Sequence, residues 1–152
     1  SNSKYLRTLS LCDLSALKIV PESIGELINL RYVDLSSTSI ASLPDSICKL
    51  YKLQTLKLRY CTFLKILPSD MQDLVNLRYL ELSSSRNIVS LPRSLCKLYN
   101  LQTLRLQYCP SLEMLPSDMQ DLVNLRHLDV RGTRLKKMPR GLGNLKDLQF
   151  LS

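Results

Sequence analysis

The sequence predicts a curved solenoid of the α/β class, with a parallel β-sheet on its concave side and short helical turns on its convex side. Three observations support this prediction. The stretch LPSDMQDLVNLR occurs twice without change, at 67–78 and at 115–126. A leucine that opens one apolar pattern returns every 23 or 24 residues, at Leu6, Leu30, Leu53, Leu77, Leu101, Leu125 and Leu148. A proline follows in every unit, at Pro21, Pro44, Pro68, Pro92, Pro116 and Pro139. Such a period is the signature of a repeat protein, so we expect residues 1–152 to form one domain of six repeats and a partial C-terminal strand.

Each repeat is expected to begin with a short strand. The phrase that starts at Leu53 continues with Leu56 and Leu58, and a spacing of two is the period of a strand. One coil cannot bury enough apolar surface to offset the entropy of ordering its own backbone. The coils must therefore stack, share a core and pair their strands in one parallel sheet.

The segment after each proline is expected to return as a helix of one or two turns. Proline has no N–H group for a central ladder, and only about eight residues remain before the next strand phrase. Ser69 with Gln72, and Ser117 with Gln120, have the spacing of a capping box, which predicts a helix start at these serines.

The composition is that of a soluble globular chain. Of its 152 residues, 45% are hydrophobic and 22% are charged. No apolar run approaches the roughly 18 residues that a membrane span needs. The five cysteines lack the C-x-x-C pairing of zinc and redox sites, which favours reduced thiols and a cytoplasmic location. A net charge of +8 is typical of either an anionic partner or a soluble basic surface.

The phrase LQTLKLRYCTFL resembles the leucine-rich repeat over the whole chain. The longer stretches LRYVDLSSTSIASLPDSICKLYKLQTLKLRYC and LVNLRHLDVRGTRLKKMPRGLGNLKDLQFLS resemble the leucine-rich domain of plant intracellular nucleotide-binding immune receptors of the coiled-coil type. This resemblance implies a sensor and regulatory domain that recognises protein. The phosphate-binding string G-x-x-x-x-G-K-[ST] of that family does not occur in this sequence. Two alternatives stay open: an engineered repeat scaffold without a natural ligand, and a stand-alone regulatory leucine-rich protein.

Side chains that flank the inward leucines should point out from the concave sheet and form three columns along the solenoid. The central column mostly alternates in charge, so it either pairs with itself across strands about 4.8 Å apart or offers a recognition stripe to a polar partner. It contains Ser10, Asp34, Lys57, Glu81, Arg105 and Asp129. One flanking column contains Thr8, Tyr32, Thr55, Tyr79, Thr103 and His127, and the other contains Cys12, Ser36, Arg59, Ser83, Gln107 and Arg131.

We expect these columns to bind a protein partner or a neighbouring domain of a larger chain. Tyrosine and arginine are enriched at interface centres, although tyrosines in line on a sheet can also simply pack on their neighbours. About 25 exposed concave positions match one side of a standard interface. The candidate contact residues are Tyr32, Asp34, Lys57, Arg59, Tyr79, Glu81, Arg105, Gln107, His127, Asp129 and Arg131.

The sequence does not predict an enzyme, a cofactor or a metal site. His127 and Asp129 could form a general-base pair, but no activated nucleophile accompanies them. The carboxylates are scattered rather than clustered. Nucleic acid is not the expected partner, because the tyrosines are not interleaved with the basic patch of the last full repeat. That patch contains Arg126, Arg131, Arg134, Lys136, Lys137 and Arg140, and it favours an acidic partner domain or plain solvation.

Two further expectations concern the cysteines and the outer coils. Cys61 and Cys109 occupy the position where many leucine-rich repeats place an asparagine, and we expect them to act as small buried side chains without redox function. The outermost strands have one unpaired edge each, which predicts concentration-dependent self-association through the uncapped ends.

Overall fold

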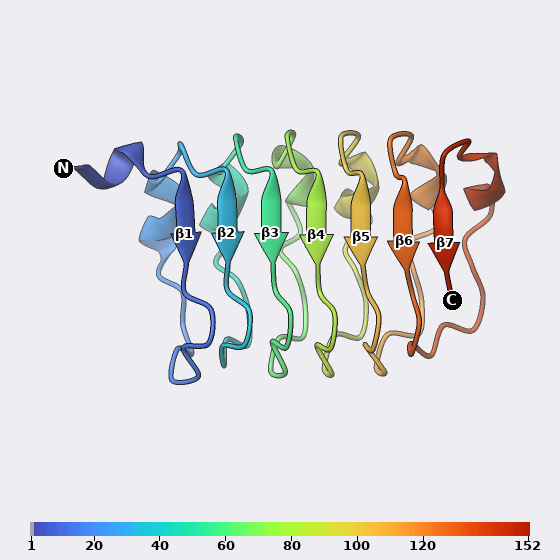
Figure 1. Ribbon diagram of the computed structural model, residues 1–152, viewed down its shortest axis with the longest axis horizontal. Helices are drawn as coiled ribbons and strands as arrows, with labels where there is room; N and C mark the ends of the chain where they lie inside the picture. Colours follow the sequence, from blue (N-terminus) through green and yellow to red (C-terminus); the bar gives the residue numbers. More distant parts are fainter. Residues whose placement is uncertain (1) are drawn as a thin grey trace.

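Seven parallel strands form one sheet in chain order, as predicted from the repeats (Figure 1). The structure is a computed structural model that describes residues 2–152. Each strand has three residues. They are β1 (Thr8–Ser10), β2 (Tyr32–Asp34), β3 (Thr55–Lys57), β4 (Tyr79–Glu81), β5 (Thr103–Arg105), β6 (His127–Asp129) and β7 (Gln149–Leu151).

The register of the sheet aligns equivalent residues of successive repeats. Tyr32 pairs with Thr55, and Thr55 pairs with Tyr79. The ladder also continues past the assigned strands, because the Tyr60 amide donates to the Ser83 carbonyl at 2.9 Å. The three columns predicted from the leucine spacing therefore run without interruption across the strands of the sheet.

The returning segments are 3₁₀ helices of three to five residues, and the described residues contain no α-helix. The capping-box prediction is wrong, since the helix in each copy of LPSDMQDLVNLR begins after Asp70 or Asp118 and has no side-chain cap. Bonds from residue i+3 to residue i dominate, as from Ile24 N to Pro21 O at 3.1 Å, because the turn must complete within a few residues. The helices are η1 (Asn2–Tyr5), η2 (Glu22–Glu26), η3 (Asp45–Lys49), η4 (Met71–Asp73), η5 (Arg93–Lys97), η6 (Met119–Asp121) and η7 (Leu142–Asn144).

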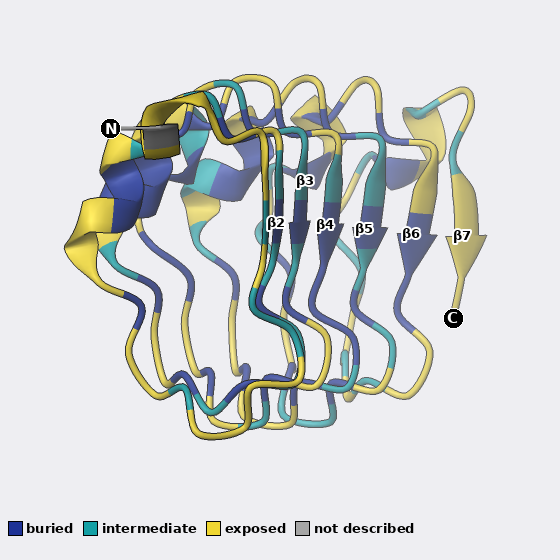
Figure 2. Cartoon of the chain, turned by 60° about the vertical axis from the view of Figure 1, so that its left-hand side comes forward, coloured by how far each residue is buried: buried dark blue, intermediate teal, exposed yellow. Residues whose placement is uncertain are grey.

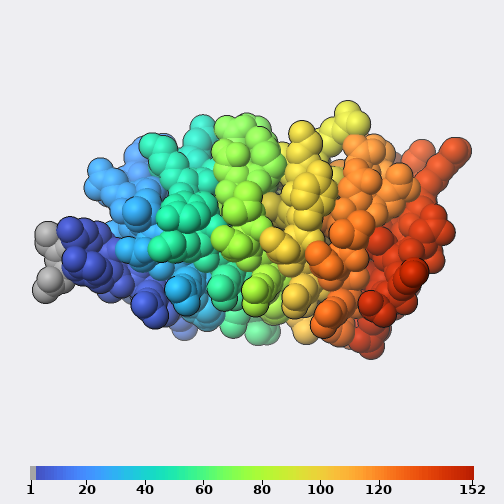
Figure 3. Space-filling view, turned by 90° about the horizontal axis from the view of Figure 1, so that it is seen from above, coloured from blue at the N-terminus to red at the C-terminus, as the bar shows by residue number. Residues whose placement is uncertain are grey.

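The core lies between the sheet and the helical turns, and Figure 2 shows buried residues in both the strands and the helical turns. Leu53, Leu56 and Leu58 of one repeat are fully buried, as are the equivalent Leu101, Leu104 and Leu106 two repeats later. Successive coils occupy successive slices of an elongated molecule (Figure 3). Each coil therefore contributes one layer to a core that its neighbours complete.

In three of the coils a small side chain bonds to the preceding coil beneath the turn that follows the strand, whereas Thr38 and Thr133 bond within their own coils. The Ser85 hydroxyl donates to the Leu58 carbonyl at 2.9 Å, and the Cys109 thiol donates to the Leu82 carbonyl at 3.0 Å. Ser85 and Cys109 are fully buried. Burial raises the pKa of the Cys109 thiol to about 11, so the expectation of an inert, structural cysteine agrees with its surroundings.

The turn itself places one residue of each coil in the left-handed region of backbone space. These residues have φ angles between 56° and 70°. They are Asp13, Ser37, Tyr60, Ser84, Tyr108 and Gly132. The side chain at this position is large in two coils and small or absent in the coils that follow them.

No helix among the described residues is long and apolar enough to cross a membrane. Leu6, just before β1, and Leu151, the last residue of β7, are each 41% exposed. Self-association through these strands stays a prediction.

Candidate protein-interaction surface

The concave face presents the three columns side by side on a rigid parallel sheet. Asp34, Lys57 and Glu81 stand on neighbouring strands in direct register, and Arg105 and Asp129 continue the same row. The candidate residues on strands β2 to β6 therefore lie in continuous lines across the sheet, in the order that the repeats predict.

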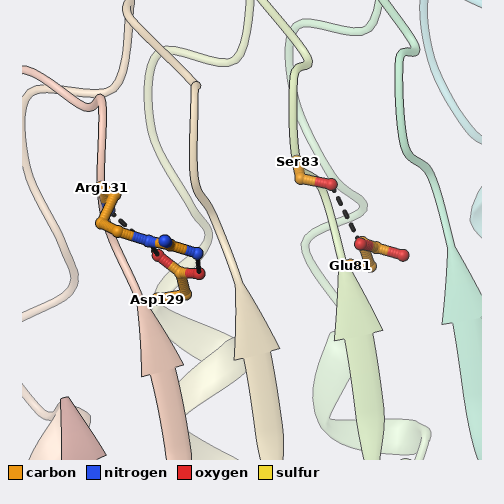
Figure 4. Close-up of polar contacts among 4 residues, drawn as sticks. All are labelled: Glu81, Ser83, Asp129 and Arg131. Atoms are coloured by element: carbon orange, nitrogen blue, oxygen red, sulfur yellow. Dashed lines mark hydrogen bonds and ion pairs between the residues drawn. The ribbon is translucent and has the colours of Figure 1, made fainter. Parts of the chain in front are cut away.

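The acidic members of the central column are bound along their own strand. Asp34 Oδ1 accepts from the Ser36 amide at 2.9 Å. Glu81 Oε2 accepts from the Ser83 hydroxyl at 3.0 Å (Figure 4). This contact lies within one coil, between a residue of the central column and the residue two positions further on.

Asp129 has the strongest of these contacts. Arg131 donates from Nε to Oδ1 at 2.9 Å and from Nη2 to Oδ2 at 2.6 Å, a bidentate arrangement that Figure 4 shows. The Arg131 guanidinium holds the pKa of the Asp129 carboxyl below its usual range. Asp129 is only 3% exposed and Glu81 only 9%, so the expectation that both side chains are freely exposed is wrong.

The basic members make different contacts. Lys57 Nζ lies 5.4 Å from the centre of the Tyr32 ring and 5.8 Å from that of Tyr79, which is cation–π geometry on both sides. Described residues of the central column form no ion pair with each other across strands. The charge ladder is therefore in register as predicted, but its three carboxylates are bound within their own coils and Lys57 lies between two tyrosine rings.

Tyr79 lies at the centre of this surface and is partly buried. Burial, followed by the charge of Glu81, raises the pKa of the Tyr79 hydroxyl, while Arg105 and Lys57 oppose that shift. Nearby, Gln107 Oε1 is buried and has no hydrogen-bond partner among the described residues. Arg59 is exposed and stacks at 4.9 Å on the ring of Tyr60. The middle strands β3 to β5 thus combine aromatic, cationic and amide groups in one area.

The arrangement around His127 does not form a general-base pair. Its Nδ1 lies 3.1 Å from Gln149 Oε1, and no hydrogen bond joins it to Asp129. Asp129 is instead occupied by Arg131. Within residues 2–152, no group of three histidine, cysteine or acidic side chains could hold a metal ion.

The basic patch of the last full repeat is partly neutralised. Arg131 is paired with Asp129, and Lys136 Nζ lies 3.6 Å from Glu113 Oε2. Both basic side chains remain substantially exposed. These ion pairs weaken the patch as an independent anion site, because part of its charge is already compensated.

Two tyrosines outside the candidate set border the concave face at the left-handed turns. Tyr60 is 47% exposed and Tyr108 is 56% exposed. They line a common hollow with Ser84, Arg86 and Gly132. The signal that could have identified this hollow is the alternation of tyrosine with serine or glycine at one turn position, with a spacing of 24 residues.

This repeat geometry defines a leucine-rich solenoid, a class of protein whose extended concave sheet serves interaction. The family model described as a leucine-rich repeat region matches residues 1–74 and 69–152. The chain therefore belongs to the leucine-rich repeat family.

Similarity to individual proteins is consistent with this assignment. The chain is 45% identical over 50 residues to RPP13-like protein 1 of Arabidopsis thaliana, which is named for disease resistance. This match covers 33% of the chain and 5% of the Arabidopsis protein.

Solved structures share the fold. The plant peptide hormone receptor RGFR1 in complex with RGF2 has a TM-score of 0.82 and 28% identity, over 97% of this chain and 24% of the receptor chain. The leucine-rich repeat protein LIC12759 of Leptospira interrogans has a TM-score of 0.70 and 25% identity, over 98% of this chain and 49% of that chain. The family and these relatives support a protein-interaction module of a kind that is typically noncatalytic.

Proposed function

We propose that this chain is the sensor and regulatory region of a plant intracellular immune receptor, and that residues 1–152 act as one recognition domain in the cytoplasm. The concave group of Tyr32, Lys57, Tyr79 and Arg105, from two adjacent columns, carries the recognition part of this proposal. It places tyrosine and arginine, which are enriched at interface centres, side by side on a parallel sheet. The similarity to the Arabidopsis protein named for disease resistance supports the receptor part.

The partner is a protein surface or a neighbouring domain of the parent chain. These residues span several strands, and a surface of this extent suits a protein better than a small molecule. Its groups also need a polar partner. Arg105 carries a positive charge without an ion pair among the described residues, and the Gln107 carbonyl oxygen lacks a donor.

The parent gene tests the receptor part. A segment encoding G-x-x-x-x-G-K-[ST] upstream of this region is expected, because such receptors couple a leucine-rich sensor to a nucleotide-binding switch. A complete parent gene without that segment refutes the receptor role.

Capture of partners by the chain, followed by titration of each purified partner, tests the recognition surface. Tyr79→Ala and Arg105→Ala are each expected to weaken binding by more than about 1 kcal/mol, or about fivefold. Arg93→Ala and Lys97→Ala, on the convex helix η5, serve as matched controls and should have little effect. Equal losses from both faces contradict the assignment of binding to the concave side.

A further inference from the structure

The hollow between Tyr60 and Tyr108 lies at the edge of the concave face, where the chain turns after β3 and β5. We call it the tyrosine slot and define it by Tyr60, Ser84, Arg86, Tyr108 and Gly132. Its volume is about 350 Å³, at the low end of the range of roughly 300 to 1,000 Å³ for ligand pockets. A space of this size can accommodate an aromatic side chain.

The alternation of large and small turn residues creates the slot. Tyr108 packs over Gly132, where an added Cβ would lie only 2.6 Å from Tyr108 Cδ1. One coil pair earlier, the Tyr60 hydroxyl interacts with Ser84. Each tyrosine therefore lies against the small residue of the next coil, and Ser84 lines the hollow together with both tyrosines.

The turn does not require these tyrosines. Tyr60 and Tyr108 have φ angles of 56° and 61°, in a region that non-glycine residues with bulky side chains rarely adopt. Ser37 and Ser84 make the same turn in neighbouring coils, with φ angles of 58° and 60°. The two rings are also about half exposed, so they add little to the core.

The charges around the slot have one sign. Arg59 and Arg86 are exposed, and neither forms an ion pair with a carboxylate within the described residues. Arg59 stacks on Tyr60, and Arg86 lines the slot. No acidic side chain lines it. An occupant that combines a planar ring with negative charge would complement both features, because aromatic rings stack and the two arginines lack anionic partners.

We propose that the tyrosine slot binds an aromatic side chain of a partner protein, within a segment that carries acidic residues on both sides of it. The rings of Tyr60 and Tyr108 contact the faces or edges of the inserted ring. Arg59 and Arg86 pair with the flanking carboxylates. Because Arg59 also belongs to a concave column, a partner bound to the concave face can continue into the slot.

A tryptophan peptide provides a direct test, since the chain contains no tryptophan. The probe is a short acidic peptide with one central tryptophan between aspartates and glutamates, and its fluorescence is followed as the chain is added. A saturable change is expected. Tyr60→Ser and Tyr108→Ser should each weaken binding at least threefold, and both should fold because serine makes this turn in other coils.

Two matched controls make the test specific. Tyr99→Ser removes a tyrosine that is also 56% exposed but does not line the slot, and it should leave binding unchanged. A peptide with asparagine and glutamine in place of the acids should bind more weakly, and the difference should shrink at high salt. Absence of a saturable change at millimolar protein, or equal binding by the wild type and both slot variants, overturns the proposal. The result is independent of the receptor role, which the parent gene tests separately.

Discussion

Ser85→Ala is expected to destabilise the solenoid by about 1 to 2 kcal/mol, because it breaks a buried bond between two coils. The Ser85 hydroxyl is the donor to the Leu58 carbonyl, at 2.9 Å, and the described residues provide no other donor to that oxygen. Both residues are fully buried. Alanine would therefore leave a carbonyl without water and without a partner, and leaving a buried acceptor unsatisfied costs roughly 1 to 3 kcal/mol.

Equilibrium unfolding in urea, with a reducing agent present, measures this loss. For a chain of this size, it corresponds to a decrease in Tm of about 2 to 8 °C. Ser85→Cys is the matched control, because the thiols of Cys61 and Cys109 donate to the equivalent carbonyls of Leu35 and Leu82. The cysteine variant should fall between the wild type and the alanine variant. An alanine variant as stable as the wild type would refute the role of this bond, as would a cysteine variant less stable than alanine.

Three further outcomes are expected. Glu81→Lys should lower the free energy of unfolding by about 1 to 3 kcal/mol, since it buries a cation between Lys57 and Arg105 on the two neighbouring strands; a loss unaffected by salt would indicate packing rather than charge. The depressed pKa of Asp129 contributes stability that is present above its unfolded pKa of about 3.9 and is lost as pH falls through its lower folded value. Arg131→Ala should therefore reduce the acid-dependent part of the stability, as measured by urea unfolding between neutral and acidic pH, and an unchanged pH profile would contradict this. Iodoacetamide at pH 8 should modify Cys12, which is partly exposed, whereas Cys109, which is buried and has a pKa of about 11, should react only after unfolding. Mass spectrometry locates the modified cysteine, and modification of Cys109 in the folded chain would contradict this prediction.

The strands and columns could be predicted from the sequence because they depend on one local rule. Leucines with strand spacing determine which side chains point inward, and the register then follows from stacking equivalent coils. Tyr32, Thr55 and Tyr79 consequently stand where their positions in the repeat predict.

The form of the returning segments could not be predicted with the same rule. A capping box requires a Ser69 side chain that bonds to the backbone of an α-helix, but the turn is a 3₁₀ helix that begins after Asp70. The available length decides between these forms, and length is a property of the complete coil rather than of the capping residues.

Burial of the charged residues depends on side chains in other coils. Glu81 has the sequence pattern of an exposed position, yet it is only 9% exposed in the stacked sheet, where it stands in register between Lys57 and Arg105 of the two neighbouring coils. The tyrosine slot has the same origin, since it requires two tyrosines two coils apart and a small residue between them. A comparison of the same turn position in successive coils, 24 residues apart, shows that pattern.

The alternation of turn residues also has a consequence for how such chains can grow. Each pair of coils contributes one tyrosine and one small turn residue to the slot. Duplication of a pair therefore adds a complete site, whereas insertion of a single coil changes the width of an existing one. The number of tyrosine slots along the edge of the concave face would therefore increase by one with each added pair of coils. Copying a 48-residue unit would multiply binding sites without altering the architecture of any one of them.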